Sequence, residues 1–293
     1  MNLERLLIEF IRVVATRLPD DVLEALRAEM KFIEEGSRLK VHDIMLRNLE
    51  YAAENRVPIC QDTGTPIFIV KLGEARPRYH ELSRSIMRAV MKATEEVPLR
   101  PNAIDPFTDE NSGNNIGRNI PWIDYELSEN QDFTEITLFL AGGGSSLPWR
   151  SRTFKPSERM QALVDFVVEA IYEYGLNACP PLFIGIGIGA NSEIAATLSR
   201  RALLKRVGER SSEERIARIE EIMLGRLNKL GIGVQGLGIG RTVLDLHIEY
   251  SFRHPTTFSV AISTSCWVFR RGTLRLYRDG GYELTTHKGV ELI

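Results

Sequence analysis

The sequence has few cysteines, no long apolar run and almost no net charge. Three cysteines in 293 residues are too few and too scattered for a disulfide framework, so we expect a cytoplasmic protein. No stretch approaches the ~18 consecutive apolar residues of a transmembrane helix, and charged residues interrupt the apolar start, which predicts an amphipathic helix and not a signal peptide. With 37 Lys+Arg against 39 Asp+Glu, nothing favours nucleic acid as a partner.

The hydrophobic pattern predicts helices and strands that alternate only in part. We therefore predict an α/β fold with mixed helices and sheet, built as one domain over residues 1–293 with a helical region at about 1–56 packed onto it. Residues 98–121 are polar and irregular, and long loops of this kind are often functional. The predicted helices are 1–18, 20–35, 41–49, 79–93, 157–174, 191–206 and 213–230, and the predicted strands are 66–71, 135–140, 182–188, 243–252, 258–264, 266–270 and 273–277.

Two glycine clusters resemble nucleotide-binding loops only superficially. Gly185-Ile-Gly-Ile-Gly189 lacks the dinucleotide fingerprint spacing, and Gly236-Leu-Gly-Ile-Gly-Arg-Thr242 has Arg241 in place of the phosphate-binding lysine. We interpret these glycines as sites where the backbone approaches a ligand or another strand closely, or as tight packing turns.

The three cysteines, Cys60, Cys179 and Cys266, each lie at a predicted junction between a loop and a strand. They are too far apart for a local CxxC motif, but none lies on the apolar face of a predicted helix. Three thiolates could hold a structural zinc with one histidine, or a [4Fe-4S] cluster at three of its four irons, or they could be unrelated. A cluster with three cysteine ligands would leave one iron open as a Lewis acid.

Around these cysteines the sequence resembles a known family of enzymes. The matching segments occur in the same order as in the iron–sulfur hydro-lyases, which include class I fumarases and L(+)-tartrate dehydratases, and they extend over about 57–286. The segments are Pro58–Gly64, Arg100–Ala103, Glu110–Asn115, Gly142–Gly144, Asn177–Gly189, Arg253–Thr257 and Ser263–Gly272.

The resemblance implies a cofactor and a substrate class. Cys60, Cys179 and Cys266 would ligate a [4Fe-4S] cluster whose open iron binds the C2 hydroxyl and a carboxylate of a 2-hydroxydicarboxylate. Gln61 would lie beside the cluster and contact the substrate, and the backbone N–H of Gly143 would approach it.

Three polar residues have both a functional and a structural interpretation. Asp62 would exchange a proton with the leaving water, or would form an Asx-turn before Gly64. His254, twelve residues before Cys266, would deliver a proton to the departing hydroxyl, or would be a structural histidine. Arg100 would clamp a substrate carboxylate with its planar fork, or would be a solvated surface arginine.

The resemblance also implies a second subunit. The chain ends where the α subunit of the two-subunit enzymes ends, so a β subunit is expected to supply the catalytic base, as an α2β2 heterotetramer. Ala141-Gly-Gly-Gly-Ser-Ser-Leu-Pro-Trp149 resembles tartrate dehydratase more than the Lys-Gly-Gly-Gly-Ser-Glu-Asn of fumarases, although Phe269 departs from the pattern. We expect dehydration of L(+)-tartrate to oxaloacetate; the alternatives are a fumarase α subunit and a non-catalytic zinc-binding or structural protein.

Overall fold

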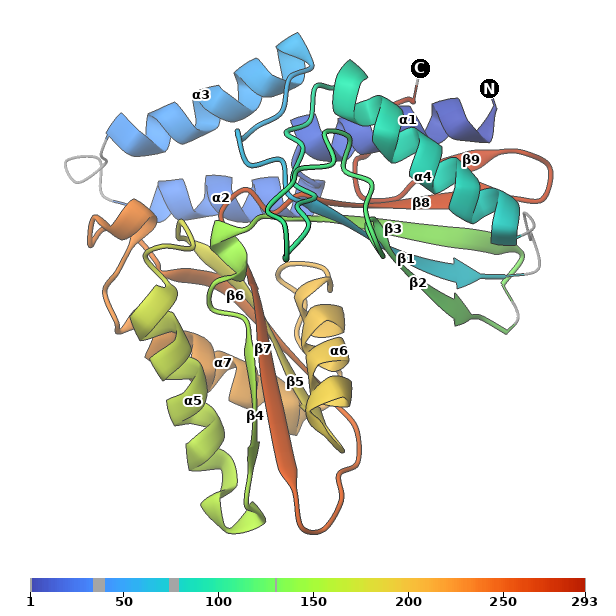
Figure 1. Cartoon of the computed structure of the whole chain (residues 1–293). Helices are drawn as coiled ribbons and strands as arrows, with labels where there is room; N and C mark the ends of the chain where they lie inside the picture. The colour runs from blue at the N-terminus through green and yellow to red at the C-terminus, as the bar shows by residue number, and fades with distance from the viewer. Residues whose placement is uncertain (1, 34–39, 74–78, 130, 293) are drawn as a thin grey trace. The chain divides into compact units, whose positions relative to one another are not determined.

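The computed structural model describes residues 2–33, 40–73, 79–129 and 131–292. The chain forms two compact units, each with its own sheet (Figure 1). The first unit is Met1–Asp20, Lys40–Gly142 and Arg270–Ile293, and the second is Asp21–Leu39 and Gly143–Phe269. The prediction of a single domain over 1–293 stays a prediction. Within the described ranges, no helix is both long and apolar enough to cross a membrane.

The first unit is built on a five-stranded mixed sheet in the order β2-β1-β3-β8-β9. β1 pairs in parallel with β2 and antiparallel with β3, and β8 pairs antiparallel with both β3 and β9. The strands are β1 (Thr65–Leu72), β2 (Trp122–Leu127), β3 (Phe133–Ala141), β8 (Arg271–Tyr277) and β9 (Tyr282–Leu284).

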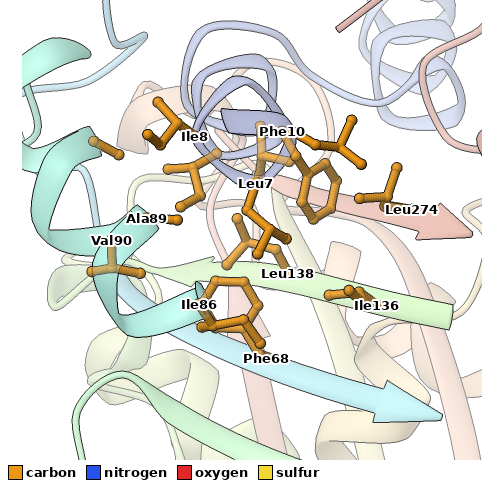
Figure 2. Packing of buried hydrophobic residues seen from close by; sticks show 14 of the residues in the cluster. Leu7, Ile8, Phe10, Phe68, Ile86, Ala89, Val90, Ile136, Leu138 and Leu274 are labelled. Atoms are coloured by element: carbon orange, nitrogen blue, oxygen red, sulfur yellow. The ribbon is translucent and has the colours of Figure 1, made fainter. Parts of the chain in front are cut away.

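Helices of the first unit confirm the predicted helical N-terminus. They are α1 (Leu3–Thr16), α3 (Lys40–Asn55) and α4 (Tyr79–Glu96). Asn2 caps α1 by accepting a hydrogen bond from the backbone N–H of Arg5 at 2.8 Å. Leu7 and Phe10 of α1 and Ile86 of α4 are fully buried against the sheet (Figure 2). Burial of each such side chain stabilises the unit by about 1.5–3 kcal/mol.

The second unit is built on a four-stranded sheet in the order β4-β7-β5-β6. β5 pairs in parallel with β6 and antiparallel with β7. On one face, Ile184 and Ile186 of β5 enter a core shared with two helices, α5 and α7. The elements are β4 (Arg150–Phe154), α5 (Arg159–Tyr174), β5 (Leu182–Gly189), α7 (Glu214–Asn228), β6 (Val243–Tyr250) and β7 (Phe258–Ser265).

The alternate residues of β5 are glycines, and they face α6 (Ser192–Leu203). A Cβ added at Gly185 would lie 2.0 Å from the carbonyl oxygen of Ser199, and one added at Gly187 would lie 1.9 Å from that of Ala195. The close approach predicted for these two glycines is therefore to the backbone of α6, which matches the packing interpretation.

The elements differ from the sequence prediction at a few places. The second predicted helix is α2 (Asp20–Phe32), and the predicted extension over 34–35 lies outside the described residues. The strand predicted at 266–270 is wrong, because 266–270 form a loop and β8 begins at Arg271. β2, β4 and β9 were not predicted. The short 3-10 turns are Gly144–Ser146, Pro156–Glu158 and Val234–Gly236.

Candidate functional site

Two of the three cysteines lie together at one end of the sheet of the second unit. Cys179 precedes β5 and Cys266 follows β7, and these strands are antiparallel neighbours with Phe183 opposite Ser265. The backbone N–H of Trp267 donates to the carbonyl oxygen of Cys179 at 3.3 Å. Cys179 is exposed and Cys266 is half-buried, so neither is an ordinary core cysteine.

Cys179 has an unusual backbone conformation. Its φ of 54° lies in the left-handed region, which costs an L-residue about 1–2 kcal/mol. The next carbonyl, that of Pro180, accepts hydrogen bonds from both the backbone N–H and the Nε2 of Gln235 at 2.9 Å. Such strain persists where surrounding contacts fix it, and it clusters at functional sites. Sequence reasoning missed Gln235 as a positioning residue; its only signal was a polar side chain inside a glycine-rich turn.

The glycine loop after β3 lies beside these cysteines within the second unit. A Cβ added at Gly144 would lie 3.3 Å from the carbonyl oxygen of Asn177, two residues before Cys179. The hydroxyl of Thr264 donates to the carbonyl of Ser145. Gly143 is exposed at the start of this turn. The second unit therefore gathers Gly143 and two cysteines at one end of its sheet.

The first unit holds the third cysteine in the loop before β1. Asn48 of α3 donates to the carbonyl of Ile59 at 2.9 Å, so the loop is fixed immediately before the half-buried Cys60. Gln61 is exposed and Asp62 is half-buried. Oδ1 of Asp62 accepts from the backbone N–H of Gly64 at 3.0 Å. Asp62 therefore forms the Asx-turn before Gly64 that was one of its two interpretations.

A buried arginine supports the same loop. Arg270, 2% exposed, donates from its guanidinium to the carbonyl oxygen of Asp62 at 2.6 Å. A hydrogen bond from a charged donor is stronger than a neutral one, so this contact fixes the backbone directly after Cys60 and Gln61. Sequence reasoning assigned no role to Arg270.

Arg100 lies next to the Asp62 loop. Its backbone N–H donates to the hydroxyl of Thr63 at 3.1 Å, and Asn102 donates to the carbonyl of Gly64 at 3.2 Å and to Oδ1 of Asp62 at 3.5 Å. The Arg100 side chain is exposed, and among the described residues no carboxylate pairs with its guanidinium. The first unit therefore brings Cys60, Asp62 and Arg100 together.

A cavity opens beside this loop, within the first unit. It has a volume of about 440 Å³, and its walls include Thr65, Asn102, Glu110 and Arg118. Most of its lining comes from the irregular segment at 98–121. Since Asn102 also contacts Asp62, the cavity and the Asp62 loop share a wall.

Asn115 organises the irregular segment, and its removal tests that role. It is 1% exposed; its Oδ1 accepts from the N–H of Asn102 at 2.7 Å, and its Nδ2 donates to the carbonyl of Arg100 and to the hydroxyl of Thr94, both at 3.0 Å. We expect Asn115→Ala to lower the free energy of unfolding by about 2–4 kcal/mol, because buried groups lose their partners and alanine tolerates the φ of 61° poorly.

The measurement is urea unfolding of the full chain. The matched control is Asn111→Ala in the same loop; Asn111 is exposed but also makes two side-chain hydrogen bonds. The control should cost less than about 1 kcal/mol. Equal losses in the two variants would contradict the role given to Asn115.

His254 lies at the opposite end of the second unit's sheet from Cys266. It is exposed in the loop between β6 and β7, whereas Cys266 follows the far end of β7. β7 has 8 residues, and at a rise of about 3.3 Å per residue its first and last residues are about 23 Å apart. The structure therefore does not bring His254 together with Cys179 and Cys266 of its own chain.

The donors available to a metal centre include three cysteine thiols. No cysteine is in a disulfide bond. The His, Cys, Asp and Glu residues that the structure describes include no group of three arranged to hold a metal ion. Thiolates suit zinc and iron–sulfur clusters. An oriented, accessible Cys179 with a strained backbone fits such a role better than it fits core packing.

Comparison with known proteins gives consistent matches along the chain. A family model described as fumarate hydratase (fumerase) matches residues 4–275. The L(+)-tartrate dehydratase subunit alpha of Escherichia coli strain K12 is 40% identical over 287 residues, which cover 98% of this chain and 94% of that protein. A putative L(+)-tartrate dehydratase subunit alpha of Methanocaldococcus jannaschii is 38% identical over 284 residues, 95% of this chain and 99% of that protein.

Proposed function

The chain belongs to the fumarate hydratase (fumerase) family, and on this premise we propose that it is the α subunit of an L(+)-tartrate dehydratase. It is a hydro-lyase of the tartrate dehydratase and fumarase type that works with a partner subunit. The substrate proposal is supported by the 40% identity, over nearly the whole chain, to the L(+)-tartrate dehydratase subunit alpha of Escherichia coli strain K12. The proposed reaction is L(+)-tartrate to oxaloacetate and water.

For the cofactor, we propose that Cys60, Cys179 and Cys266 hold one [4Fe-4S] cluster. The support is the donor set itself: three thiols on three loops, two of them neighbours at one sheet end. When bound, a cluster with three protein ligands supplies an iron that acts as a Lewis acid toward the substrate hydroxyl and carboxylate.

The chain's own residues have distinct proposed roles. Arg100 binds a carboxylate of the substrate, since its guanidinium is exposed while its backbone is held by Thr63 and Asn115. Gln61 contacts the substrate next to Cys60. Asp62, half-buried directly after Gln61, exchanges a proton with the leaving water.

The glycine loop has a proposed role in substrate choice. The exposed Gly143 offers a backbone N–H to the substrate. Ser145 and Ser146 follow Gly143 closely in the chain. Their small hydroxyl side chains would hydrogen-bond the C3 hydroxyl, which tartrate has and malate lacks. A site built to bind that hydroxyl discriminates against an analogue without it.

The proposed assembly is a cytoplasmic α2β2 heterotetramer. The β subunit supplies the base that removes the C3 proton, while hydroxide leaves C2 and is protonated to water. The resulting enol then becomes oxaloacetate. This chain alone is therefore expected to turn over no substrate.

Substrate choice tests the proposal directly. The chain is co-expressed anaerobically with its partner subunit, and kcat/KM is measured for L(+)-tartrate and for malate, with the chain alone as control. We expect kcat/KM for tartrate to be at least about tenfold higher than for malate. Malate lacks the C3 hydroxyl, so the groups that would bind this hydroxyl lose their hydrogen bonds, which costs more than ~1.4 kcal/mol.

The other outcomes have defined meanings. A tenfold preference for malate or fumarate would make the chain a fumarase α subunit. Activity of the chain without its partner would overturn the two-subunit proposal. Bound zinc without turnover of either substrate would favour the non-catalytic alternative.

A further inference from the structure

One charged side chain of the first unit is buried without a carboxylate beside it. Arg270 is 2% exposed, and among the described residues its buried Nε has no hydrogen-bond partner. Nη1 donates to the main-chain carbonyl oxygen of Asp62 at 2.6 Å, but no carboxylate in the described part of the chain, that of Asp62 included, forms an ion pair with the guanidinium. A guanidinium is always charged in a protein, so the first unit contains a buried positive charge.

Several other charges of this unit are compensated. The carboxylate of Glu9, which is 1% exposed, lies 2.8 Å from Nη2 of Arg5 and 2.7 Å from Nη2 of Arg56. Nε of Arg275, on β8, lies 3.1 Å from Oε2 of Glu135. A buried charge without a partner is strongly unfavourable. We therefore expect a negatively charged group, bound by the protein, to complete the pair that the buried guanidinium lacks.

Arg270 lies against the loop that carries Cys60. The backbone N–H of Leu140, near the end of β3, donates to the carbonyl oxygen of Arg270 at 3.0 Å. A Cβ added at Gly64 would lie 2.7 Å from the carbonyl carbon of the same leucine, so both segments pack on the end of β3. Asp62, which accepts from the guanidinium, follows Cys60 by two residues, and two residues span at most about 8 Å. The buried charge is therefore close to any group that Cys60 binds.

The anion that suits this place is a cluster bound by thiolates. Three thiolates make a [4Fe-4S] centre with one open iron negative overall, and net charge helps to set the reduction potential of such a centre. Because a Coulomb interaction weakens only gradually with distance, a counter-charge needs no direct contact with the cluster. A substrate carboxylate is a poorer match, since it needs a donor within about 3 Å. The enclosed side chain of Arg270 is less accessible to substrate than the exposed side chain of Arg100.

We propose that the buried charge of Arg270 is the counter-charge of the [4Fe-4S] cluster. The inference rests on the proposed cluster at Cys60, Cys179 and Cys266. Arg270 is then a positioning residue with two effects: its hydrogen bond holds the chain directly after Cys60, and its charge stabilises the anionic cluster. In the chain without a cluster the same charge has no partner. The charge therefore stabilises the bound cluster without stabilising the cluster-free fold.

The reduction potential tests the charge directly. Arg270→Gln removes the charge and keeps an amide N–H donor, whereas Arg270→Lys keeps the charge. Each chain is co-expressed with the partner subunit, the complexes are purified anaerobically, and the midpoint potential of the cluster is measured without substrate. Because reduction adds a negative charge, Arg270→Gln shifts the potential to more negative values, and Arg270→Lys recovers most of the shift. The matched control is Arg275→Gln, which removes a charge already paired with Glu135 and leaves the potential unchanged.

Iron retention and unfolding give two further readouts. With a chelator present, the Arg270→Gln complex loses iron about 10- to 100-fold faster than the unmodified complex, the range found for groups that support metal ligands. Arg270→Lys and Arg275→Gln stay near the unmodified rate. In urea, the iron-free full chains of Arg270→Gln and Arg270→Lys unfold at the same concentration, or the glutamine variant at a higher one, because the charge has no partner there.

Each contrary result has a defined meaning. An unchanged potential in the Arg270→Gln complex overturns the counter-charge, and a raised KM for tartrate beside that unchanged potential assigns Arg270 to substrate binding instead. An iron-free Arg270→Gln chain that unfolds at a lower urea concentration than Arg270→Lys shows that the protein itself compensates the charge, which also overturns the proposal. An unmodified complex without iron and sulfide overturns the proposed cofactor itself.

Discussion

Replacing Cys179 by serine is expected to remove bound iron and to lower turnover at least about 1,000-fold, because the loss of a Lewis acid costs several kcal/mol of transition-state stabilisation. Cys60→Ser and Cys266→Ser should lose iron and turnover to the same extent, although the three cysteines lie in different loops. Iron and sulfide content, the visible absorbance and kcat are measured on complexes purified anaerobically.

The fold of the chain should survive this change. Cys179 is exposed, so serine there should alter the free energy of unfolding by less than about 0.5 kcal/mol. Circular dichroism and urea unfolding check this point. A variant that keeps full iron content and full turnover would remove that cysteine from the ligand set, and a chain that unfolds would assign it a structural role.

Replacing Gly187 by alanine is expected to destabilise the second unit by ~4 kcal/mol or more, enough to leave little soluble protein. The added Cβ would lie 1.9 Å from the carbonyl oxygen of Ala195 and 2.3 Å from the backbone nitrogen of Ser199. Both are helix backbone atoms, so α6 itself would have to move away from β5. Soluble yield and urea unfolding measure the effect.

The matched control is Gly225→Ala in α7. A Cβ there meets nothing within 4 Å, and alanine favours a helix over glycine by up to about 1 kcal/mol. The control should be neutral or stabilising. A Gly187→Ala chain that unfolds at the same urea concentration as the unmodified chain would show that the contact between β5 and α6 is not close.

The elements found from the sequence are those with a strong apolar pattern. α1, α4 and β5 each bury a continuous face, and periodicity locates them. The three missed strands all lie at edges of their sheets: β2 and β9 in the first unit, and β4 in the second. β4 reads Arg-Ser-Arg-Thr-Phe, with only Phe154 buried, because an edge strand paired on one side has little apolar surface to hide.

The strand predicted at 266–270 fails for a related reason. Val268 and Phe269 are buried, so the apolar signal is genuine, but the segment leads from the last strand of one unit into the first strand residue of the other. Burial comes from loop packing there, and no ladder forms. Hydrophobicity alone does not distinguish a buried loop from a buried strand.

The sequence identified candidate site residues but not the contacts that hold them. Sequence motifs located the loops of Cys60, Cys179 and Cys266, and the structure holds each at the end of a strand. Positions of the supporting groups, Arg270 and Gln235, depend on contacts between segments far apart in the chain. The place of His254 depends on strand pairing, because the register of β5 with β7 decides which end of the sheet each loop occupies.

Metal analysis of the unmodified complex tests the central claim most directly. The chain and its partner subunit are purified without air, and iron, sulfide and zinc are quantified beside the visible spectrum and the rate of tartrate dehydration. We expect a brown protein with iron and sulfide in equal amounts, as a [4Fe-4S] cluster requires, and loss of both colour and turnover on exposure to air. A colourless protein that turns over tartrate in air, or one that contains zinc in place of iron, would contradict it.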